Sequence, residues 1–319
     1  MISDKLFDEI LLKPARAGAN VLHIVSGYAT AAMASNHLAQ LTAINNNISV
    51  NLIIGMTPLD GLSITNHKGF IELSKNFGIE RFSCSYLIGK PPAHSKVYSW
   101  FKNDKPFQGY LGSANYTQKA FSIYQRELME ITDPVAGREY FNLISPQTIY
   151  CDNLEADSSI LIYSTKDKEP ISATGKPATE LSQTQDSQNV LISLLGNQGN
   201  LPTRSGLNWG QRPEAKREPN QAYIRVPANI AKSNFFPDRA IQFTILTDDD
   251  KILICAVAQD GDKAIHSTLN NSQIGEYFRR RLGVANGKLI TRDDLAKYGR
   301  TDLSFYKIDD ETYFMDFSV

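Results

Sequence analysis

Two short motifs bring together side chains that can carry out phosphoryl chemistry. The first is His94-Ser95-Lys96, in which the imidazole and the ammonium are two residues apart, so that on a strand both point to the same face. The second is Gly112-Ser113-Ala114-Asn115, which places a hydroxyl and an amide at a turn where a ligand can approach the backbone closely. Together they supply one nucleophile and several donors to phosphate oxygens, as phosphoryl transfer without a metal ion requires.

The order of these motifs resembles the signature of the phospholipase D superfamily, which is HxK followed by GSxN. The resemblance implies that His94 attacks phosphorus and forms a phosphohistidine. It further implies that Lys96 and Asn115 hold the phosphoryl oxygens, and it places Ser113 in the same active-site set.

The superfamily also uses a carboxylate that fixes the tautomer of the imidazole. The Asp that usually follows the Lys is absent at that spacing here, and the nearest one is Asp104. Nuclease members instead place a Glu after the Asn, on the next strand. Glu127 fits that place, and Glu130 is the alternative.

The number of motifs predicts an oligomeric state. In this mechanism a second histidine must protonate the leaving oxygen, and the sequence has one His-x-Lys. The remaining histidines, which lack a Lys two residues on, are His23, His37, His67 and His266. We therefore expect a C2 homodimer with one composite active site on the two-fold axis, and no metal ion or other cofactor. His23, inside an apolar run, is expected to be a hydrogen-bonded core residue.

Alternating helix-like and strand-like runs in the first 130 residues supply the elements that position these motifs. The expected strands are Val21 to Val25, Val50 to Ile54, Arg81 to Leu87, His94 to Phe101 and Phe107 to Leu111, and the main helices are Ala29 to Ile44 and His67 to Phe77. This alternation predicts an α/β layered domain. Short strand-like runs beyond residue 189 predict a small, mainly β barrel or sandwich, in which only Ile274 to Leu282 reads as a helix.

The composition changes to small and polar residues between Thr165 and Gln188, which is typical of a linker. We place a phospholipase D-like nuclease domain at 1–170, the linker at 171–188 and a second domain at 189–319.

The second half resembles the C-terminal domain of NgoFVII-type restriction endonucleases. The resemblance rests on Tyr223-Ile224-Arg225-Val226-Pro227, Phe235-Phe236-Pro237, the run from Ile274 to Gly283, and Tyr298-Gly299-Arg300-Thr301. In that family a phospholipase D-like nuclease domain is joined to a B3-like DNA-binding pseudobarrel, which grips the major groove with two arms. The resemblance therefore implies an α/β phospholipase D-like layered domain followed by a mainly β B3-like pseudobarrel domain.

The two arms would be Arg204 to Asn220 and Gln259 to Asn271. Residues 204–232 carry six basic and two acidic side chains, which favours an anion-binding surface. Arginine and lysine pair with guanine or phosphate, and asparagine and glutamine read adenine. The candidate DNA-binding residues are Arg204, Asn208, Gln211, Arg212, Lys216, Arg217, Lys263, His266, Asn270 and Asn271.

The composition excludes several other classes. The formal charge of −1 and the apolar fraction of 42% are those of an ordinary globular protein. The three cysteines, Cys84, Cys151 and Cys255, form no CxxC pair, which argues against a zinc site or a disulfide framework and favours a cytoplasmic protein. No apolar run approaches the roughly 18 residues that span a bilayer, so we expect no membrane partner.

The resemblance to NgoFVII-type enzymes implies a type II-like site-specific deoxyribonuclease, a subunit of a restriction-modification system that includes a cognate DNA methyltransferase. Some relatives act with a separate ATP-dependent helicase-like subunit, and this chain has no Gly-rich Lys-Ser/Thr loop of its own. The alternatives are a phospholipase or other phosphodiesterase, and a DNA-binding module without nuclease activity.

Two further charged runs allow competing interpretations. Pro237-Asp238 followed by Asp249-Asp250-Lys251 formally matches the PD-(D/E)xK pattern of magnesium-dependent nucleases, but the acidic run lies between two apolar runs and reads as a hairpin turn whose carboxylates face solvent. Arg279-Arg280-Arg281 lies in the last turn of a predicted helix, where basic residues favour the helix dipole and solvent. At most one or two of these arginines are expected to face DNA.

Overall fold

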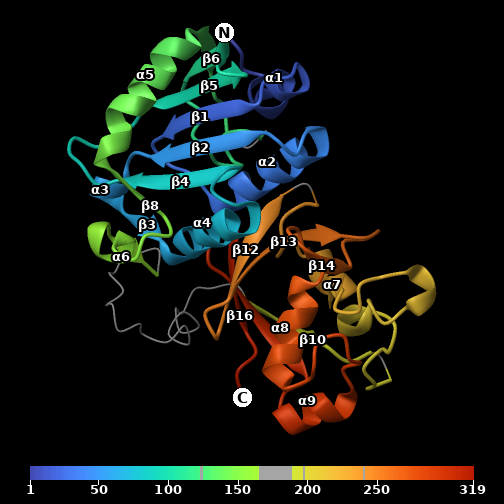
Figure 1. Ribbon diagram of the computed structural model, residues 1–319. Coiled ribbons are helices and arrows are strands. Elements are labelled where there is room, and N and C mark those ends of the chain that lie inside the picture. Colours follow the sequence, from blue (N-terminus) through green and yellow to red (C-terminus); the bar gives the residue numbers. More distant parts are fainter. Residues whose placement is uncertain (123–124, 165–188, 197, 240) are drawn as a thin grey trace. The chain divides into compact units, whose positions relative to one another are not determined.

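The chain forms two compact units, Met1–Thr174 and Gly175–Val319. The computed structural model describes residues 1–122, 125–164, 189–196, 198–239 and 241–319 (Figure 1). The predicted linker at 171–188, together with the polar stretch from Thr165 to Gln188 around it, lies outside the described residues.

A seven-stranded mixed sheet forms the centre of the first unit, in the order β7-β6-β5-β1-β2-β4-β8. Its strands are β1 (Val21–Ser26), β2 (Ser49–Ile54), β4 (Phe82–Leu87), β5 (Lys96–Lys102), β6 (Lys105–Gly112), β7 (Met129–Thr132) and β8 (Thr148–Tyr150). β1, β2 and β4 run parallel, whereas the other neighbours are antiparallel. A separate two-stranded parallel sheet joins β3 (Leu62–Ser63) to β9 (Ile162–Tyr163).

Helices lie on both faces of the large sheet. They are the π-helix η1 (Phe7–Leu12), α1 (Lys13–Arg16), α2 (Ala31–Ile44), α3 (Thr57–Asp60), α4 (Ile64–Phe77), α5 (Pro134–Ile144), the 3-10 turn η2 (Ser145–Gln147) and α6 (Ala156–Ser159). Successive side chains of β5 point to opposite faces. Trp100 donates its indole N–H to Ile10 O of η1 (2.8 Å) on one face, and Ser99 lies against Gly137 of α5 on the other.

Helix starts in this unit follow local capping signals. Thr30 caps α2 by accepting from Met33 N, and Ser63 caps α4 in the same way. Asp133 caps α5, and Pro134 in its first turn needs no hydrogen-bond partner for a backbone N–H. α5 then packs its apolar side chains, including Ile144, over the buried ends of β1, β2 and β4.

The second unit is built on another seven-stranded sheet, in the order β10-β15-β16-β12-β13-β14-β11. Its strands are β10 (Asn189–Ser193), β11 (Ile224–Arg225), β12 (Gln242–Thr247), β13 (Ile252–Ala258), β14 (Ala264–Ser267), β15 (Asp302–Lys307) and β16 (Thr312–Asp316). Only β12 and β16 pair in parallel among these strands. Aromatic side chains fill much of its core, where the ring centroid of Phe236 lies 5.2–5.7 Å from those of Phe243, Phe305 and Tyr313.

Short helices surround this second sheet. They are the 3-10 turns η4 (Gly206–Asn208) and η5 (Pro213–Ala215), then α7 (Ala228–Ala231), α8 (Gln273–Leu282) and α9 (Arg292–Tyr298). α8 ends at Gly283 in the left-handed conformation, as its sequence predicts. The expectation of a single helix in this region is wrong, because the short α7 and the longer α9 also form. The start of α9 carries a reciprocal capping box between Thr291 and Asp294.

Candidate functional site

The predicted site residues of the first unit gather at one edge of its sheet. His94 lies just before β5 and Lys96 begins it, while Ser113 and Asn115 directly follow β6. Lys96 pairs with Ser26 at the end of β1, and β6 runs antiparallel to β5. The end of β1, the start of β5 and the end of β6 therefore meet, and the two sequence motifs lie side by side.

Two glycines allow the loops at this edge to approach the motifs closely. Gly55 follows β2, where an added Cβ would lie 2.1 Å from Ala93 O, and Ala93 N donates to Gly55 O (2.9 Å). At Gly27, after β1, an added Cβ would lie 3.0 Å from His94 Cδ2 and 3.3 Å from Asn115 Oδ1. A larger residue at either glycine would therefore displace a motif.

Lys96 is hydrogen-bonded to His94. Its Nζ lies 3.0 Å from His94 Nε2 and donates to His94 O at 2.6 Å. Because an ammonium can only donate, Nε2 is the acceptor and the neutral imidazole carries its proton on Nδ1. Lys96 is 6% exposed, and burial lowers its pKa while the negative charge of Glu127 opposes that change. A buried lysine thus sets the tautomer of an exposed imidazole.

The loop after β1 orients the side-chain amide of Asn115. Its Oδ1 accepts from Tyr28 N at 3.1 Å, so the Nδ2 group with its two donors is at the opposite end of the amide. Ser26 fixes both loops, since its hydroxyl donates to Tyr28 O (2.6 Å) and accepts from Tyr116 N (2.9 Å). The amide can therefore present donors to an anionic ligand.

Glu127 reaches the site through Ser113. The Ser113 hydroxyl donates to Glu127 Oε2. The negative charge of the carboxylate also favours the protonated form of Lys96. Among the described contacts Glu127 makes no hydrogen bond to His94, so the expected contact with the imidazole is replaced by one with Ser113. Glu130 is exposed on β7, farther along the chain from this cluster.

Four residues of this edge are absent from the sequence-based site: Ser26, Gly27, Tyr28 and Asp60. Ser26 ends β1, Gly27 and Tyr28 follow it, and Asp60 lies in α3 after β2. The carboxyl ends of β1 and β2 meet at one sheet edge because the strands are parallel. Binding sites in α/β sheets form outside such strand ends, so the residues that follow the predicted strands could have been included among the candidates.

The other histidines of the first unit have contacts of their own. His37 is fully buried with a partner at each ring nitrogen, and burial lowers its pKa to about 4. His67 pairs with Asp157 (2.8 Å). The ring centroid of His23 lies 4.9 Å from that of Phe141. Its buried Nδ1 has no hydrogen-bond partner in the described structure, so the expectation of a hydrogen-bonded core histidine is wrong for that nitrogen.

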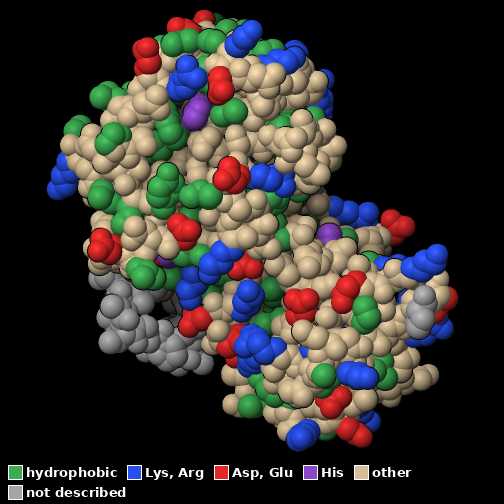
Figure 2. All heavy atoms as spheres, viewed as in Figure 1, with side chains coloured by type: hydrophobic (Ala, Val, Ile, Leu, Met, Phe, Trp, Pro, Cys, Tyr) green, Lys and Arg blue, Asp and Glu red, His purple; other side chains and the backbone are tan. Residues whose placement is uncertain are grey.

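In the second unit, the first predicted arm makes several contacts within itself. The guanidinium of Arg204 forms an ion pair with Glu214 of the same arm. The main-chain carbonyl of Arg204 accepts from Arg212 Nε (2.7 Å). The guanidinium of Arg217 lies 3.8 Å from the Trp209 ring centroid, and Lys216 is exposed with a positive φ. Figure 2 shows acidic and basic side chains interspersed on the face of this unit in view.

Two amides of the same arm have structural roles. Asn208 is fully buried, donates to Ile290 O (2.8 Å) and accepts from Ile290 N (2.9 Å). The expectation that Asn208 contacts DNA is therefore corrected, because a base cannot reach an amide enclosed in the core. Gln211 is half-buried, and its Nε2 donates to Pro219 O (2.9 Å) and Gly287 O (3.2 Å).

The second arm has two of its four candidates exposed at the surface. Lys263 and Asn270 are exposed, while the half-buried His266 is joined to Asn271 at 3.2 Å. β11 pairs with β14, and Val226 N next to β11 donates to Lys263 O (2.8 Å). The pairing places the second arm next to the strand that follows the first arm.

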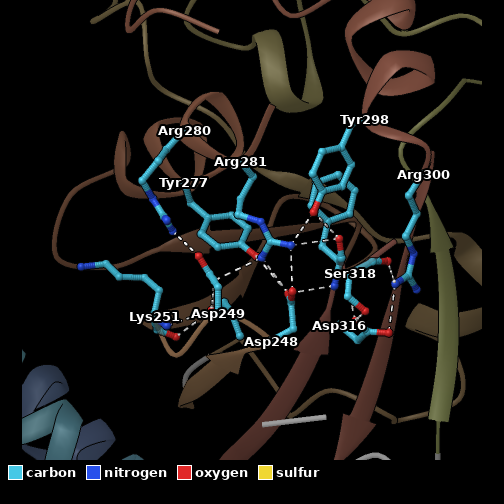
Figure 3. Close-up of polar contacts among 12 residues, drawn as sticks. Asp248, Asp249, Lys251, Tyr277, Arg280, Arg281, Tyr298, Arg300, Asp316 and Ser318 are labelled. Atoms are coloured by element: carbon cyan, nitrogen blue, oxygen red, sulfur yellow. Dashed lines mark hydrogen bonds and ion pairs between the residues drawn. The ribbon is translucent and has the colours of Figure 1, made fainter. Parts of the chain in front are cut away.

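The acidic turn between β12 and β13 corrects a further expectation. Asp248, only 7% exposed at its side chain, pairs with Arg281 (2.7 Å) and accepts from Phe317 N (3.0 Å). Asp249 is bound by Arg280 (2.5 Å) and Arg281 (3.2 Å). Figure 3 shows these carboxylates pointing toward the arginines of α8. The predicted hairpin turn is present, but these two carboxylates are bound within the unit instead of facing solvent.

The three consecutive arginines of α8 point in different directions. Arg279 is fully buried and donates to Lys288 O (2.8 Å), and Arg281 is 11% exposed at its side chain. Arg280 is 58% exposed at its side chain and is the one of the three that reaches solvent. The expectation that these arginines serve the helix dipole and solvent is therefore corrected for Arg279 and Arg281, which bind groups inside the unit.

A divalent-metal site is not formed by the PD-(D/E)xK match. Asp249 already binds two guanidinium groups and the Thr247 hydroxyl (2.6 Å). Within the described residues, no cluster of three His, Cys, Asp or Glu side chains could hold a metal ion. Nor, over the same residues, is any helix long and apolar enough to cross a bilayer.

Comparison with protein families covers most of the sequence. Residues 4–158 match the model of the NgoFVII restriction endonuclease N-terminal PLD domain, and residues 182–309 match the NgoFVII C-terminal B3-like DNA-binding domain. These matches confirm the predicted fold class of a phospholipase D-like domain followed by a B3-like pseudobarrel. No curated protein sequence matches the chain significantly.

Solved structures give weaker matches. Nuc, a phospholipase D family member from Salmonella typhimurium, is 14% identical with a TM-score of 0.31, over 44% of this chain and 87% of its own. NucT from Helicobacter pylori is 18% identical with a TM-score of 0.33, over 46% of this chain and 91% of its own. Polyphosphate kinase from Porphyromonas gingivalis is 14% identical with a TM-score of 0.33, over 55% of this chain and 26% of its own.

Proposed function

The chain belongs to the family of NgoFVII restriction endonucleases, and we propose on that premise that it cleaves double-stranded DNA at a specific sequence by metal-independent phosphoryl transfer. The observation that carries this proposal is the cluster of His94, Lys96 and Asn115 at one sheet edge. It offers one imidazole as nucleophile and several N–H donors for phosphoryl oxygens.

The proposed reaction has two steps. In the first, Nε2 of His94 bonds to phosphorus while the P–O bond to the leaving oxygen breaks, and a second imidazole gives that oxygen a proton. In the second, that imidazole takes a proton from water as the water oxygen attacks phosphorus and the N–P bond breaks. Lys96 and Asn115 donate hydrogen bonds to the phosphoryl oxygens in both steps, and the ammonium of Lys96 also offsets their negative charge. Lys96 must transfer its hydrogen bond from Nε2 to a phosphoryl oxygen before attack, because Nε2 needs its lone pair.

A second copy of the chain is the proposed source of the other imidazole. His37 and His67 of the first unit are buried and bound to their own partners, which supports a composite site on a two-fold axis. Mixed dimers of His94→Ala and Lys96→Ala chains should not regain full cleavage, because both defects then fall in one shared site. Full recovery would contradict the composite site.

Glu127 is the proposed carboxylate of the site, acting through Ser113 and through the charge on Lys96. Glu130, exposed on β7, remains the alternative for orienting the imidazole. Comparison of Glu127→Gln with Glu130→Gln separates them, because only the acting carboxylate should alter cleavage.

Sequence reading is assigned to the second unit. The proposed contacts are Arg204, Gln211, Arg212, Lys216, Arg217, Lys263, His266, Asn270 and Asn271. Their positively charged members account for phosphate binding, and their amides for contacts with base edges. We also propose a cytoplasmic restriction-modification system with a cognate methyltransferase, in which any ATP-dependent helicase-like activity comes from a separate subunit.

Incubation of the purified protein with plasmid DNA in EDTA tests the reaction. Cleavage at fixed sites in EDTA is expected, with loss in His94→Ala. Cleavage that requires Mg²⁺ would overturn the mechanism. Binding to duplex DNA without cleavage would instead support a DNA-binding module. Hydrolysis of phospholipid without cleavage of DNA would support a phospholipase.

A further inference from the structure

Tyr28 lies beside both motifs of the proposed nuclease site. Its ring centroid is 5.9 Å from that of His94, at an interplanar angle of 78°, which is an edge-to-face contact. Its main-chain N–H holds Asn115 Oδ1 at 3.1 Å. The side chain is 39% exposed, so that part of the ring borders solvent at the site. One residue thus contacts the imidazole through its side chain and the amide through its backbone.

The Tyr28 side chain is fixed at its far end. Its hydroxyl donates to Asp60 Oδ2 at 2.5 Å, and this hydrogen bond is the main cause that raises the pKa of Tyr28 to about 12. The phenol therefore stays protonated at neutral pH and keeps its bond to Asp60. At the near end, Ser26 Oγ donates to Tyr28 O (2.6 Å). The ring is consequently held between the loop after β1 and the end of α3.

His94 needs such a support. It is exposed, and among the described contacts its ring is hydrogen-bonded only at Nε2, to Lys96. That bond must break for attack, which leaves packing against Tyr28 to hold the plane of the ring. Misplacement of a nucleophile by about 1 Å can cost on the order of 10²-fold in rate.

We propose that Tyr28 is a positioning residue of the nuclease site and that Asp60 fixes its ring. The proposal rests on the proposed role of His94 as nucleophile. Tyr28 acts by holding the imidazole and takes no part in proton transfer, because its hydroxyl group donates its hydrogen bond to Asp60.

Single-turnover cleavage of plasmid DNA by the full-length protein tests the proposal, with DNA affinity measured separately. Tyr28→Leu should lower the rate by about 10- to 100-fold without weakening binding. Tyr28→Phe and Asp60→Ala should each lower the rate by about three- to tenfold, and the double variant should be no slower than either single one. Asp60→Asn should lower the rate less than Asp60→Ala does, because its amide oxygen can still accept the bond. The control is Tyr150→Phe, at an exposed tyrosine of β8.

A second readout does not depend on cleavage. Carbethoxylation of His94 by diethyl pyrocarbonate, followed by peptide mass spectrometry, should be at least threefold faster in Tyr28→Leu than in Tyr150→Phe. The fully buried His37 should stay unmodified, which shows that the variant is folded. If wild type fails to cleave DNA, the proposed function fails, while the reactivity of His94 still decides the role of Tyr28. Unchanged reactivity of His94 in Tyr28→Leu would overturn the proposal, whatever happens to the rate.

Discussion

Each unit contains a pair of charged or titratable residues separated by one position, and the two pairs have very different surroundings. In the first unit, His94 is exposed and Lys96 beneath it is its hydrogen-bond partner. In the second unit, Asp249 of the pair with Lys251 binds two arginines of α8. Both pairs match the spacing of a nuclease motif, but only His94 and Lys96 are followed by a second motif, Gly112-Ser113-Ala114-Asn115.

The difference lies in what remains available to a ligand. Lys96 and Asn115 lie at strand ends, where Lys96 is hydrogen-bonded to His94 and Asn115 Oδ1 accepts from the loop after β1. Asp248 and Asp249 face a helix whose guanidinium groups satisfy their oxygens (Figure 3). Charge that is matched inside a unit stabilises that unit, whereas charge at an open sheet edge can bind a phosphate.

The largest expected effect concerns cleavage. His94→Ala should lower the cleavage rate by at least about 10³-fold, because it removes the proposed nucleophile. Asp249→Asn should leave it within about threefold, since no step uses that carboxylate. Both are measured with plasmid DNA in EDTA, at a temperature where each variant is folded. Loss of cleavage in Asp249→Asn alone would reverse the comparison of the two pairs.

The second effect concerns stability. Arg281→Ala should destabilise the protein by about 3–5 kcal/mol, because it leaves the buried Asp248 without its main partner. Arg280→Ala is the matched control, and loss of its exposed ion pair should cost at most about 1 kcal/mol. Urea unfolding measures both changes. Equal destabilisation would show that burial does not distinguish the two arginines.

Local sequence signals predicted much of this arrangement. Short apolar runs located β1 and β2, and Gly283 marked the end of α8. HxK and GSxN share an edge because the strands between them are neighbours, which the order of the motifs already implied. Where the local pattern determines a strand or a helix end, the sequence alone is sufficient to predict it.

Long-range contacts limited the rest. The buried place of Asn208 depends on Ile290, 82 positions along the chain. The contact between Asp248 and Arg281 depends on how β12, β13 and α8 pack together. Tyr28 lies at the site because β1 and β2 are parallel and bring it next to Asp60. None of these contacts leaves a periodic pattern in the sequence, so a polar residue that binds inside the fold cannot be told from one that faces solvent or DNA.

A third expected effect is that the two units lose stability over different pH ranges. Burial lowers the pKa of His37 to about 4, below the roughly 6.5 of an unfolded histidine. As pH falls from about 6.5 to 4 only the unfolded state takes up this proton, so the first unit loses stability. Burial would raise the pKa of Asp249, but hydrogen bonds from Thr247 and Arg280 hold it below the usual value. The loss of stability from that group therefore begins only below about pH 4.

Fluorescence can follow the two units separately, because Trp100 lies in the first and Trp209 in the second. Urea unfolding of Trp209→Phe reports the first unit, and its difference from wild type reports the second. His37→Gln should make the slope of stability between pH 6.5 and 4 shallower for the first unit without abolishing it, because burial also lowers the pKa values of His23 and His67. An unchanged slope would show that His37 does not contribute to the pH dependence of the stability of the first unit.

The smallest effect concerns the charges that the second unit leaves exposed. Lys216→Ala and Lys263→Ala should each reduce the slope of log Kd against log salt by about one, because each removes one proposed phosphate contact. Lys297→Ala, at an exposed position of α9 outside both arms, should leave the slope unchanged. Fluorescence anisotropy with a duplex of arbitrary sequence is sufficient, since phosphate contacts carry no sequence information. An equal change in all three variants would mean that net charge, and not the position of the arms, controls binding.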